Sequence, residues 1–216
     1  MARSSPLPPP PPPEGIRTWP DREALLRDRA VVLGELVRLH IGPGRLGLLV
    51  LWAALAALGW SFVGTGLIAF EEGYDVISLI IGLVCLVAGA AALVPAVVLV
   101  AVGVARDRRV RPLLDAWGAL DRDPVRDLPL RAPGVSVVWM VLSFLLCAAG
   151  LFCCVVAPAS AVPGEPYGLV ALMTGLGLIA WVTGLIGLVK AFAHRRWVLR
   201  VLAGPPAPRA YGAAHR

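Results

Sequence analysis

The stretch RDRRVRPLLDAWGALDRDPVRDLPLR, residues 106–131, divides the chain into two halves of similar layout. It carries seven arginines, and a pair of long hydrophobic stretches lies on either side of it. Within each pair, a short connecting segment contains acidic residues but no Lys or Arg; these segments are residues 71–75 and 158–166. This alternation of long apolar stretches and short polar segments predicts a small protein that crosses a membrane several times.

The composition excludes an ordinary soluble domain. Hydrophobic residues make up 58% of the 216 residues and charged residues only 16%, and the mean hydropathy is +0.77. Soluble proteins contain about 45–50% apolar and about 25% charged residues. Most of this chain is therefore expected to face lipid or to pack inside a membrane.

Four stretches without charged side chains are each long enough to form one transmembrane helix. They contain 25, 30, 33 and 24 residues, and a helix needs about 20 apolar residues to cross the hydrocarbon core. We therefore predict an all-α integral membrane protein, a bundle of four transmembrane helices. The predicted spans are residues 46–70, 76–105, 135–157 and 167–189.

The basic residues predict the orientation of these spans. Of the 20 Lys and Arg residues, seven precede the first span, seven lie in the loop 106–134, and six lie in the tail 190–216. Short loops rich in Lys and Arg remain in the cytoplasm. We therefore expect both termini and the central loop to be cytoplasmic, an N-in/C-in arrangement.

Residues 1–20 form a proline-rich tail with an unbroken run from Pro8 to Pro13. Such a run favours the polyproline II conformation, in which the backbone stays solvated. We interpret the tail as a disordered segment or stiff spacer. The alternative is that it docks into a groove lined by aromatic side chains.

Residues 21–41 read as a cytoplasmic amphipathic helix, because leucine and valine recur on one side and charged residues on the other. Two positions are open to it: on the inner leaflet, with its arginines toward anionic headgroups, or packed against the central loop or a partner chain. Gly42-Pro43-Gly44 should end this helix. In the loop 106–134, a short interfacial helix is expected from Pro112 onward.

Small residues recur at steps of three and four within the spans, which predicts close helix packing. The longest series lie in the second, third and fourth spans: Ser78, Gly82, Cys85, Gly89, Ala92 and Ala96; Ser143, Cys147, Gly150, Cys154 and Ala157; Gly177, Ala180, Gly184, Gly187 and Ala191. Ala54, Ala57, Ser61 and Gly64 form a shorter series in the first span. The two hairpins resemble each other, but a shared topology would produce most of that similarity, so we infer no duplication.

Few residues suggest chemistry. Asp121 and Asp123 form a D-x-D pair of the kind that holds a divalent metal, although in a solvated turn such acids more often neutralise neighbouring arginines. The four cysteines, Cys85, Cys147, Cys153 and Cys154, all lie in spans. A thiol oxidoreductase would need exposed exchanging thiols, so we interpret the cysteines as small packing residues.

Other motifs are excluded by their context. Residues 64–69 and 175–180 both fit the dinucleotide pattern G-x-G-x-x-A, but they lie inside hydrophobic helices and not at a strand-to-helix turn. The three histidines, His40, His194 and His215, are expected in the cytoplasm, away from the thiols, so no Cys/His metal site is predicted. The spans contain no ionisable residue of the kind that ion-coupled carriers use. The polar residues left to line a pore are Ser61, Thr65, Ser78, Thr174 and Thr183.

These observations predict a protein without catalytic activity, cofactor or metal, and without a nucleic-acid-binding module. We expect a scaffold or regulatory protein that binds a protein partner, as yet unidentified, through its cytoplasmic face and touches anionic lipid headgroups there. The alternative is a subunit of a small oligomeric channel or transporter, and a homo-oligomer is open in either case. The ratio of 19 Arg to 1 Lys resembles proteins of GC-rich bacteria, which places the chain in a bacterial inner membrane.

Overall fold

The computed structural model describes residues 7–13, 19–121, 123, 125–162 and 167–202. Parts of the predicted tail, the turn at 163–166 and the C-terminal residues 203–216 with His215 lie outside these ranges. Every regular element within the described ranges is a helix: α1 (Arg22–Ile41), α2 (Pro43–Glu72), α3 (Val76–Gly118), α4 (Pro133–Ala159) and α5 (Tyr167–Trp197), with a 3₁₀ turn η2 (Pro129–Arg131) and a π-helical turn η3 (Val198–Leu202).

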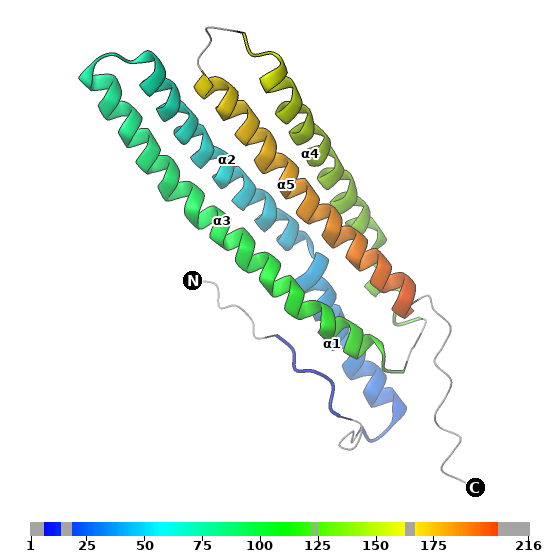
Figure 1. The fold of residues 1–216 in the computed structure, drawn as a ribbon. Coiled ribbons are helices and arrows are strands. Elements are labelled where there is room, and N and C mark those ends of the chain that lie inside the picture. Colours follow the sequence, from blue (N-terminus) through cyan, green and yellow to red (C-terminus); the bar gives the residue numbers. More distant parts are fainter. Residues whose placement is uncertain (1–6, 14–18, 122, 124, 163–166, 203–216) are drawn as a thin grey trace.

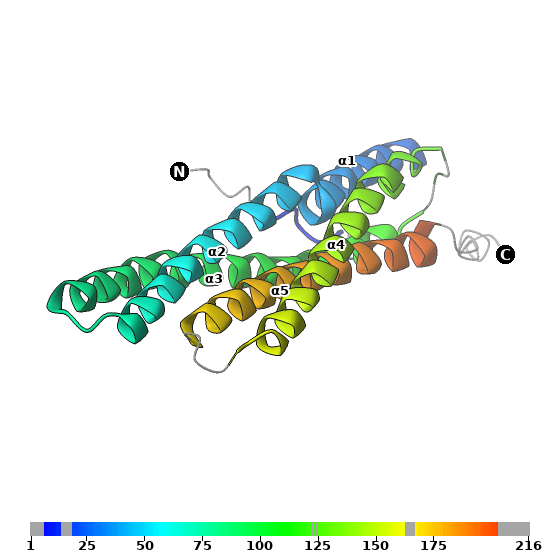
Figure 2. The ribbon, with the colours of Figure 1, turned by 90° about the horizontal axis from the view of Figure 1, so that it is seen from above.

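Four of these helices are long and apolar enough to cross a membrane, which confirms the predicted all-helical class and the number of spans. Helices α2 and α3 form one antiparallel hairpin, and α4 and α5 form the other (Figure 1). Helix α2 also packs on α5, which joins the hairpins in the order α3, α2, α5, α4 (Figure 2). Among the described residues α3 and α4 do not pack extensively on each other, so the bundle is an open row and not a closed ring.

The predicted small-residue series lie where helices approach each other most closely. A Cβ atom added at Gly89 of α3 would lie 2.6 Å from the carbonyl oxygen of Gly59 in α2. In the second hairpin, a Cβ atom at Gly177 of α5 would lie 2.8 Å from the carbonyl oxygen of Gly150 in α4. Such distances leave no room for a side chain, so the glycines allow backbone-to-backbone packing, as the sequence predicted.

The glycines of the two dinucleotide-like strings have the same role. Gly66 lies against Gly82 of α3, and Gly175 lies directly beneath the indole ring of Trp60. Both strings are interior segments of α2 and α5. Their glycines therefore serve packing, in agreement with the exclusion of a nucleotide site.

Helices α3 and α5 continue well past the predicted ends of their spans. The expectation of a separate short helix beginning at Pro112 is wrong, because α3 runs without interruption from Val76 to Gly118. Proline removes one backbone hydrogen bond from a helix, but the residues that follow Pro112 are held by packing: Leu114 and Trp117 are buried. Helix α5 likewise reaches Trp197, so the first residues of the predicted basic tail are helical.

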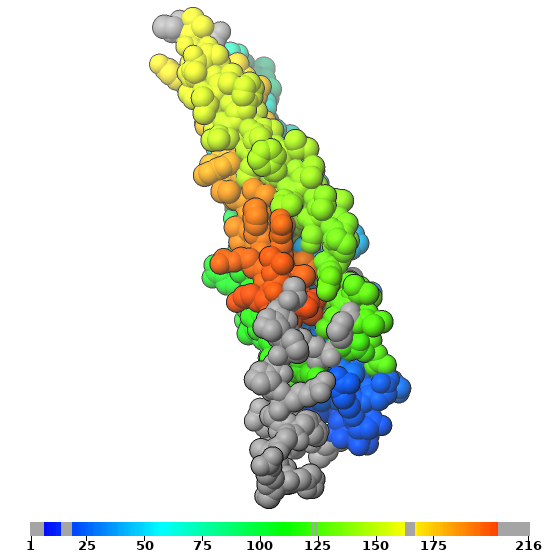
Figure 3. All heavy atoms as spheres, turned by 90° about the vertical axis from the view of Figure 1, so that its right-hand side faces the viewer, coloured from blue at the N-terminus to red at the C-terminus, as the bar shows by residue number. Residues whose placement is uncertain are grey.

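The extended helix ends gather with α1 into a compact unit that we call the basic end, comprising α1, residues 106–132 and residues 190–202. Helix α1 ends at Ile41, and α2 starts only two residues later, at the predicted Gly42-Pro43 break. Figure 3 shows the molecule as a long, narrow body in which α1 lies toward one end and the neighbouring ends of α4 and α5 lie at the other. The polar part of the chain is therefore concentrated at one end.

Candidate functional site

The basic end has its own hydrophobic core. Asp21 begins α1 by accepting a hydrogen bond from the backbone N–H of Ala24, so it is the N-cap of this helix. The buried side of α1 packs on the end of α3, on η2 and on the end of α5. The core is formed by Leu33, Leu36, Val37, Ile41, Val110, Leu114, Trp117, Leu120, Leu130, Trp139, Ala191 and Trp197. Helix α1 therefore lies against the central segment of the chain.

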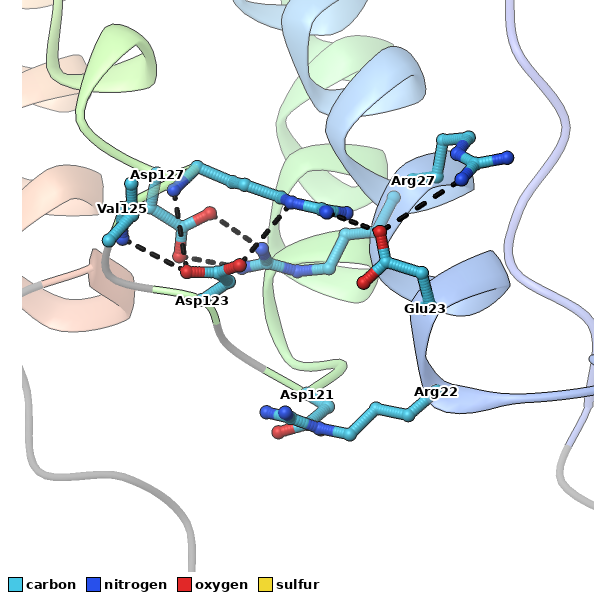
Figure 4. Close-up of polar contacts among 9 residues, drawn as sticks. Arg22, Glu23, Arg27, Asp121, Asp123, Val125 and Asp127 are labelled. Carbon is cyan, nitrogen blue, oxygen red and sulfur yellow. Dashed lines mark hydrogen bonds and ion pairs between the residues drawn. The ribbon is translucent and has the colours of Figure 1, made fainter.

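Three ion pairs attach the loop after α3 to α1 (Figure 4). Arg29 and Asp127 form a two-pronged pair with N–O distances of 2.6 and 3.3 Å, and only 1% and 3% of their side chains are exposed. Arg22 pairs with Asp121, and Arg126 pairs with Glu23, at the surface. The hydrogen bond to Glu23 raises the pKa of Arg126 above its ordinary value. Together these pairs fix the loop on the helix.

The D-x-D residues are engaged by arginines. Asp121 contacts Arg22, whereas Asp123 lies 3.4 Å from Arg126 and accepts a hydrogen bond from the backbone N–H of Val125 at 3.0 Å (Figure 4). The two aspartates therefore bind different arginines on different elements. This arrangement matches the interpretation that these acids neutralise neighbouring arginines in a turn.

A second polar cluster is buried where the basic end meets the long helices. The Lys190 ammonium lies 2.7 Å from Asp107, and the Nδ1 atom of His40 lies 3.9 Å from the same carboxylate. The rings of His40 and His194 are 6.4 Å apart, and both are almost fully buried. Three helices, α1, α3 and α5, thus each contribute ionisable groups to one buried site.

Trp139 of α4 completes this cluster. Its indole N–H donates a hydrogen bond to the carbonyl oxygen of Ile41 at 2.9 Å, and its ring lies 5.1 Å from the Lys190 ammonium. The Trp139 side chain is completely buried. A cation above an aromatic face is attracted by the ring quadrupole, so Trp139 both anchors α1 and stabilises the lysine charge.

The described part of the proline-rich tail, residues 7–13, lies against the basic end. The indole N–H of Trp117 donates a hydrogen bond to the carbonyl oxygen of Pro9 at 2.9 Å, and Leu7 packs on the hydrophobic core. Pro9 and Pro10 are exposed, whereas Pro11 is partly buried. The described tail residues therefore contact the basic end through the Trp117 indole and the Leu7 side chain.

At the opposite end, acidic side chains cap helices. The Glu71 carboxylate accepts a hydrogen bond from the backbone N–H of Gly168 at 2.7 Å, so the end of α2 caps the first turn of α5. Asp75 caps α3, and the hydrogen bonds from Ser78 hold the pKa of Asp75 below its usual value. Glu71 and Asp75 therefore stabilise helix ends.

Most of the polar residues that were candidates to line a pore form hydrogen bonds within their own helices. Ser61, Thr65 and Thr183 each donate to the carbonyl oxygen four residues earlier, at distances of 2.7 to 2.9 Å. The thiols behave as packing groups: all four are free, Cys147 lies against Trp181, and Cys154 lies against Thr174. Neither set forms a chemical site in the described chain.

Sequence reasoning missed the cluster around Lys190 and Asp107, although two signals pointed to it. Lys190 is the only lysine among 20 basic residues, and it directly follows the fourth predicted span, just as Asp107 lies two positions after the second. Both therefore sit at the same depth. Comparisons with protein-family models, with curated proteins and with solved structures give no match.

Proposed function

We propose that the protein is a non-enzymatic scaffold or regulatory protein of a bacterial inner membrane, with both termini cytoplasmic, that binds a partner protein through the basic end. The observation that carries the proposal is the buried Arg29–Asp127 pair, which fixes α1 and the loop after α3 as one unit. A polar segment held in this way presents a defined surface, whereas a mere connection between spans needs no such order.

The surface of the basic end is strongly cationic. Its exposed arginines are Arg22, Arg27, Arg38, Arg108, Arg109, Arg111, Arg131, Arg195, Arg196 and Arg200. Several acids also lie there, but most of those on α1 and in the loop bind arginines, and Asp28 accepts a hydrogen bond from Trp19. Clustered arginines on a rigid element favour an acidic protein surface as partner, and they favour anionic headgroups where they reach the membrane.

The test uses a photo-crosslinking amino acid introduced in cells at Arg27, whose side chain is 75% exposed. The same amino acid at Glu72, which is exposed at the opposite end, serves as the matched control. The proposal expects a protein adduct from position 27 that is absent at position 72 and is lost when Asp127→Asn breaks the buried pair. Adducts at position 27 with lipid or a second copy of the chain alone would contradict it.

The second candidate, a subunit of a small channel or transporter, is favoured by the buried Asp107–Lys190 pair next to His40 and His194. Ionisable groups buried close to a membrane are costly and mark ion or proton pathways in many transporters. The chain would then carry substrate-dependent or proton flux in proteoliposomes, and Asp107→Asn would abolish it. Flux equal to that of empty liposomes would rule this candidate out.

A further inference from the structure

A cavity of about 50 Å³ lies between α2, α3 and α5, next to the buried cluster. Arg45, Asp107 and Lys190 supply its charged groups, and the rest of its wall is apolar, with Leu48 and Leu99 among the lining side chains. The pairing of Lys190 with Asp107 at 2.7 Å uses the one carboxylate in the wall. The wall therefore carries an excess of positive charge.

The charged and apolar parts of the wall are separated along the helix axes. Helix α2 runs away from the basic end, and its Arg45 precedes the lining residue Trp52 by seven positions, about 10 Å along a helix. Helix α3 runs toward the basic end, and its apolar lining residues precede Asp107. Each helix thus places its charge toward the basic end and its apolar side chains toward the middle of the long helices.

Further cations surround the charged end. The positive charge of Arg106 repels that of Arg45, and the positive charge of Arg111 repels that of Lys190. The acidic group facing both Arg45 and Lys190 is Asp107, and His40 also approaches it. Arg45 and Lys190 give the wall two cations against one carboxylate, and a bound anion would offset their mutual repulsion.

The cavity is open at its side. Leu48 and Leu99, which line it, are 40% and 39% exposed on the outer surface of the helix row. A cavity needs about 10–15 Å³ of space to hold one water molecule, so this cavity has room for the oxygens of a phosphate group but not for a whole lipid. The remainder of such a ligand would lie outside, along the exposed leucines.

We propose that this cavity binds the phosphate of an anionic phospholipid, with Arg45 and Lys190 contacting the headgroup and the acyl chains lying over Leu48 and Leu99. Basic pockets between transmembrane helices bind anionic lipid headgroups in this way. The site requires only that α2, α3 and α5 cross a membrane, and it is independent of any protein partner of the basic end.

Two variants test separately how the charge of the site and the volume of the cavity contribute to lipid binding. Arg45→Gln removes a cation from the wall. Gly103→Leu leaves every charge in place and reduces the space in the cavity. Gly103 lines the cavity, and a Cβ atom added there meets nothing within 4 Å, so the larger side chain can be accommodated. The matched controls lie on the exposed surface of α3: Arg109→Gln removes one charge, as Arg45→Gln does on α2, and Ala101→Leu introduces the same side chain as Gly103→Leu but outside the cavity.

The measurement is native mass spectrometry of the full-length chain loaded from equal amounts of phosphatidylglycerol and phosphatidylcholine. We expect one phosphatidylglycerol to stay bound while other lipids are stripped, and retention to fall about fivefold in Arg45→Gln, the effect of one basic residue near a membrane surface. Gly103→Leu should lose the lipid as well, and both controls should retain it.

Three results would overturn the proposal. The first is equal retention of phosphatidylcholine, and the second is undiminished phosphatidylglycerol in both Arg45→Gln and Gly103→Leu. The third is displacement of the lipid by soluble glycerol phosphate at an equal concentration, which would mean that the acyl chains add nothing and that the site takes a free phosphate. If Arg45→Gln does not fold, Gly103→Leu decides the outcome by itself.

Discussion

The guanidinium group of Arg29 lies 2.6 Å from the carboxylate of Asp127, 98 residues further along the chain, and both side chains are shielded from solvent. This pair crosses from α1 to the loop after α3. Around it, Leu33 and Leu36 of α1 pack on Leu114 of α3 within one hydrophobic core. The pair therefore determines how the loop sits on the helix, because a buried charge that lost its partner would be strongly destabilising.

We predict that Asp127→Ala destabilises the protein by about 3–5 kcal/mol, because the Arg29 charge would stay buried without a partner. The double variant Arg29→Met with Asp127→Leu should recover most of this loss, because two apolar side chains of similar volume replace both charges. Denaturant unfolding in detergent micelles, followed by tryptophan fluorescence, measures both effects.

The matched control for this prediction is Arg27→Met. Arg27 lies 3.9 Å from Glu23 on the surface of the same helix, and the two side chains are 75% and 54% exposed. An exposed pair contributes about 0–1 kcal/mol. If Asp127→Ala costs no more than Arg27→Met, the buried pair does not hold the loop in place.

Two glycine-to-alanine changes should alter stability in opposite directions. In Gly89→Ala the new methyl group would lie 2.6 Å from the Gly59 carbonyl oxygen, and we expect a loss of about 1–3 kcal/mol from overpacking. In Gly47→Ala nothing lies within 4 Å of the methyl group, and we expect a gain of up to about 1 kcal/mol from helix propensity. Unfolding midpoints in the same detergent compare the two, and shifts of the same sign would contradict close packing of α2 on α3.

The number and type of the candidate membrane-spanning helices could be predicted from the sequence because they depend on local properties. Uncharged stretches of sufficient length predict spans, and the series through Gly82 and Gly89 predicts a contact face, since both signals repeat along a single helix. The sequence does not predict which helix packs on each of these faces. The contact of α2 with α5 makes the bundle a row. It depends on individual side-chain contacts, such as that of Trp60 with Gly175, which the periodicity of the sequence does not reveal.

The basic end was harder to predict, for the same physical reason. Pro112 and the charges around it suggest a loop, but burial of Leu114 and Trp117 against α1 overrides that local signal and extends α3. The Asp107–Lys190 contact joins residues 83 positions apart, and sequence spacing carries no information about it. The sequence does show that each of the two residues lies just after the end of a predicted span. This similarity indicates a contact only when α3 and α5 are known to pack near α1 at this end.

The proline-rich tail should be released when Trp117 loses its hydrogen-bond donor. Trp117→Phe keeps an aromatic ring in the core but removes the N–H that binds the Pro9 carbonyl oxygen, a bond that contributes about 0.5–1.5 kcal/mol. A spin label at Pro10→Cys, on an otherwise cysteine-free chain, should become more mobile in the electron paramagnetic resonance spectrum. Trp19→Phe is the control, because Trp19 bonds to Asp28 instead. Equal mobility in the unmodified chain and in Trp117→Phe would show that the bond does not hold the tail.

The orientation of the chain can be tested with single cysteines at the two ends of the helix row. Tyr74 is fully exposed in the turn between α2 and α3, and Ala119 is exposed just after α3 at the basic end. All of the Lys and Arg residues that the structure describes lie on the side of Ala119, so the distribution of basic charge predicts that this side is cytoplasmic. In intact cells, a membrane-impermeant maleimide should therefore label Tyr74→Cys, whereas Ala119→Cys should react only after the membrane is permeabilised. The four native cysteines are first replaced by alanine to leave one thiol per chain. Labelling of Ala119→Cys alone in intact cells would place the basic end outside, and the proposed cytoplasmic partner would then be excluded.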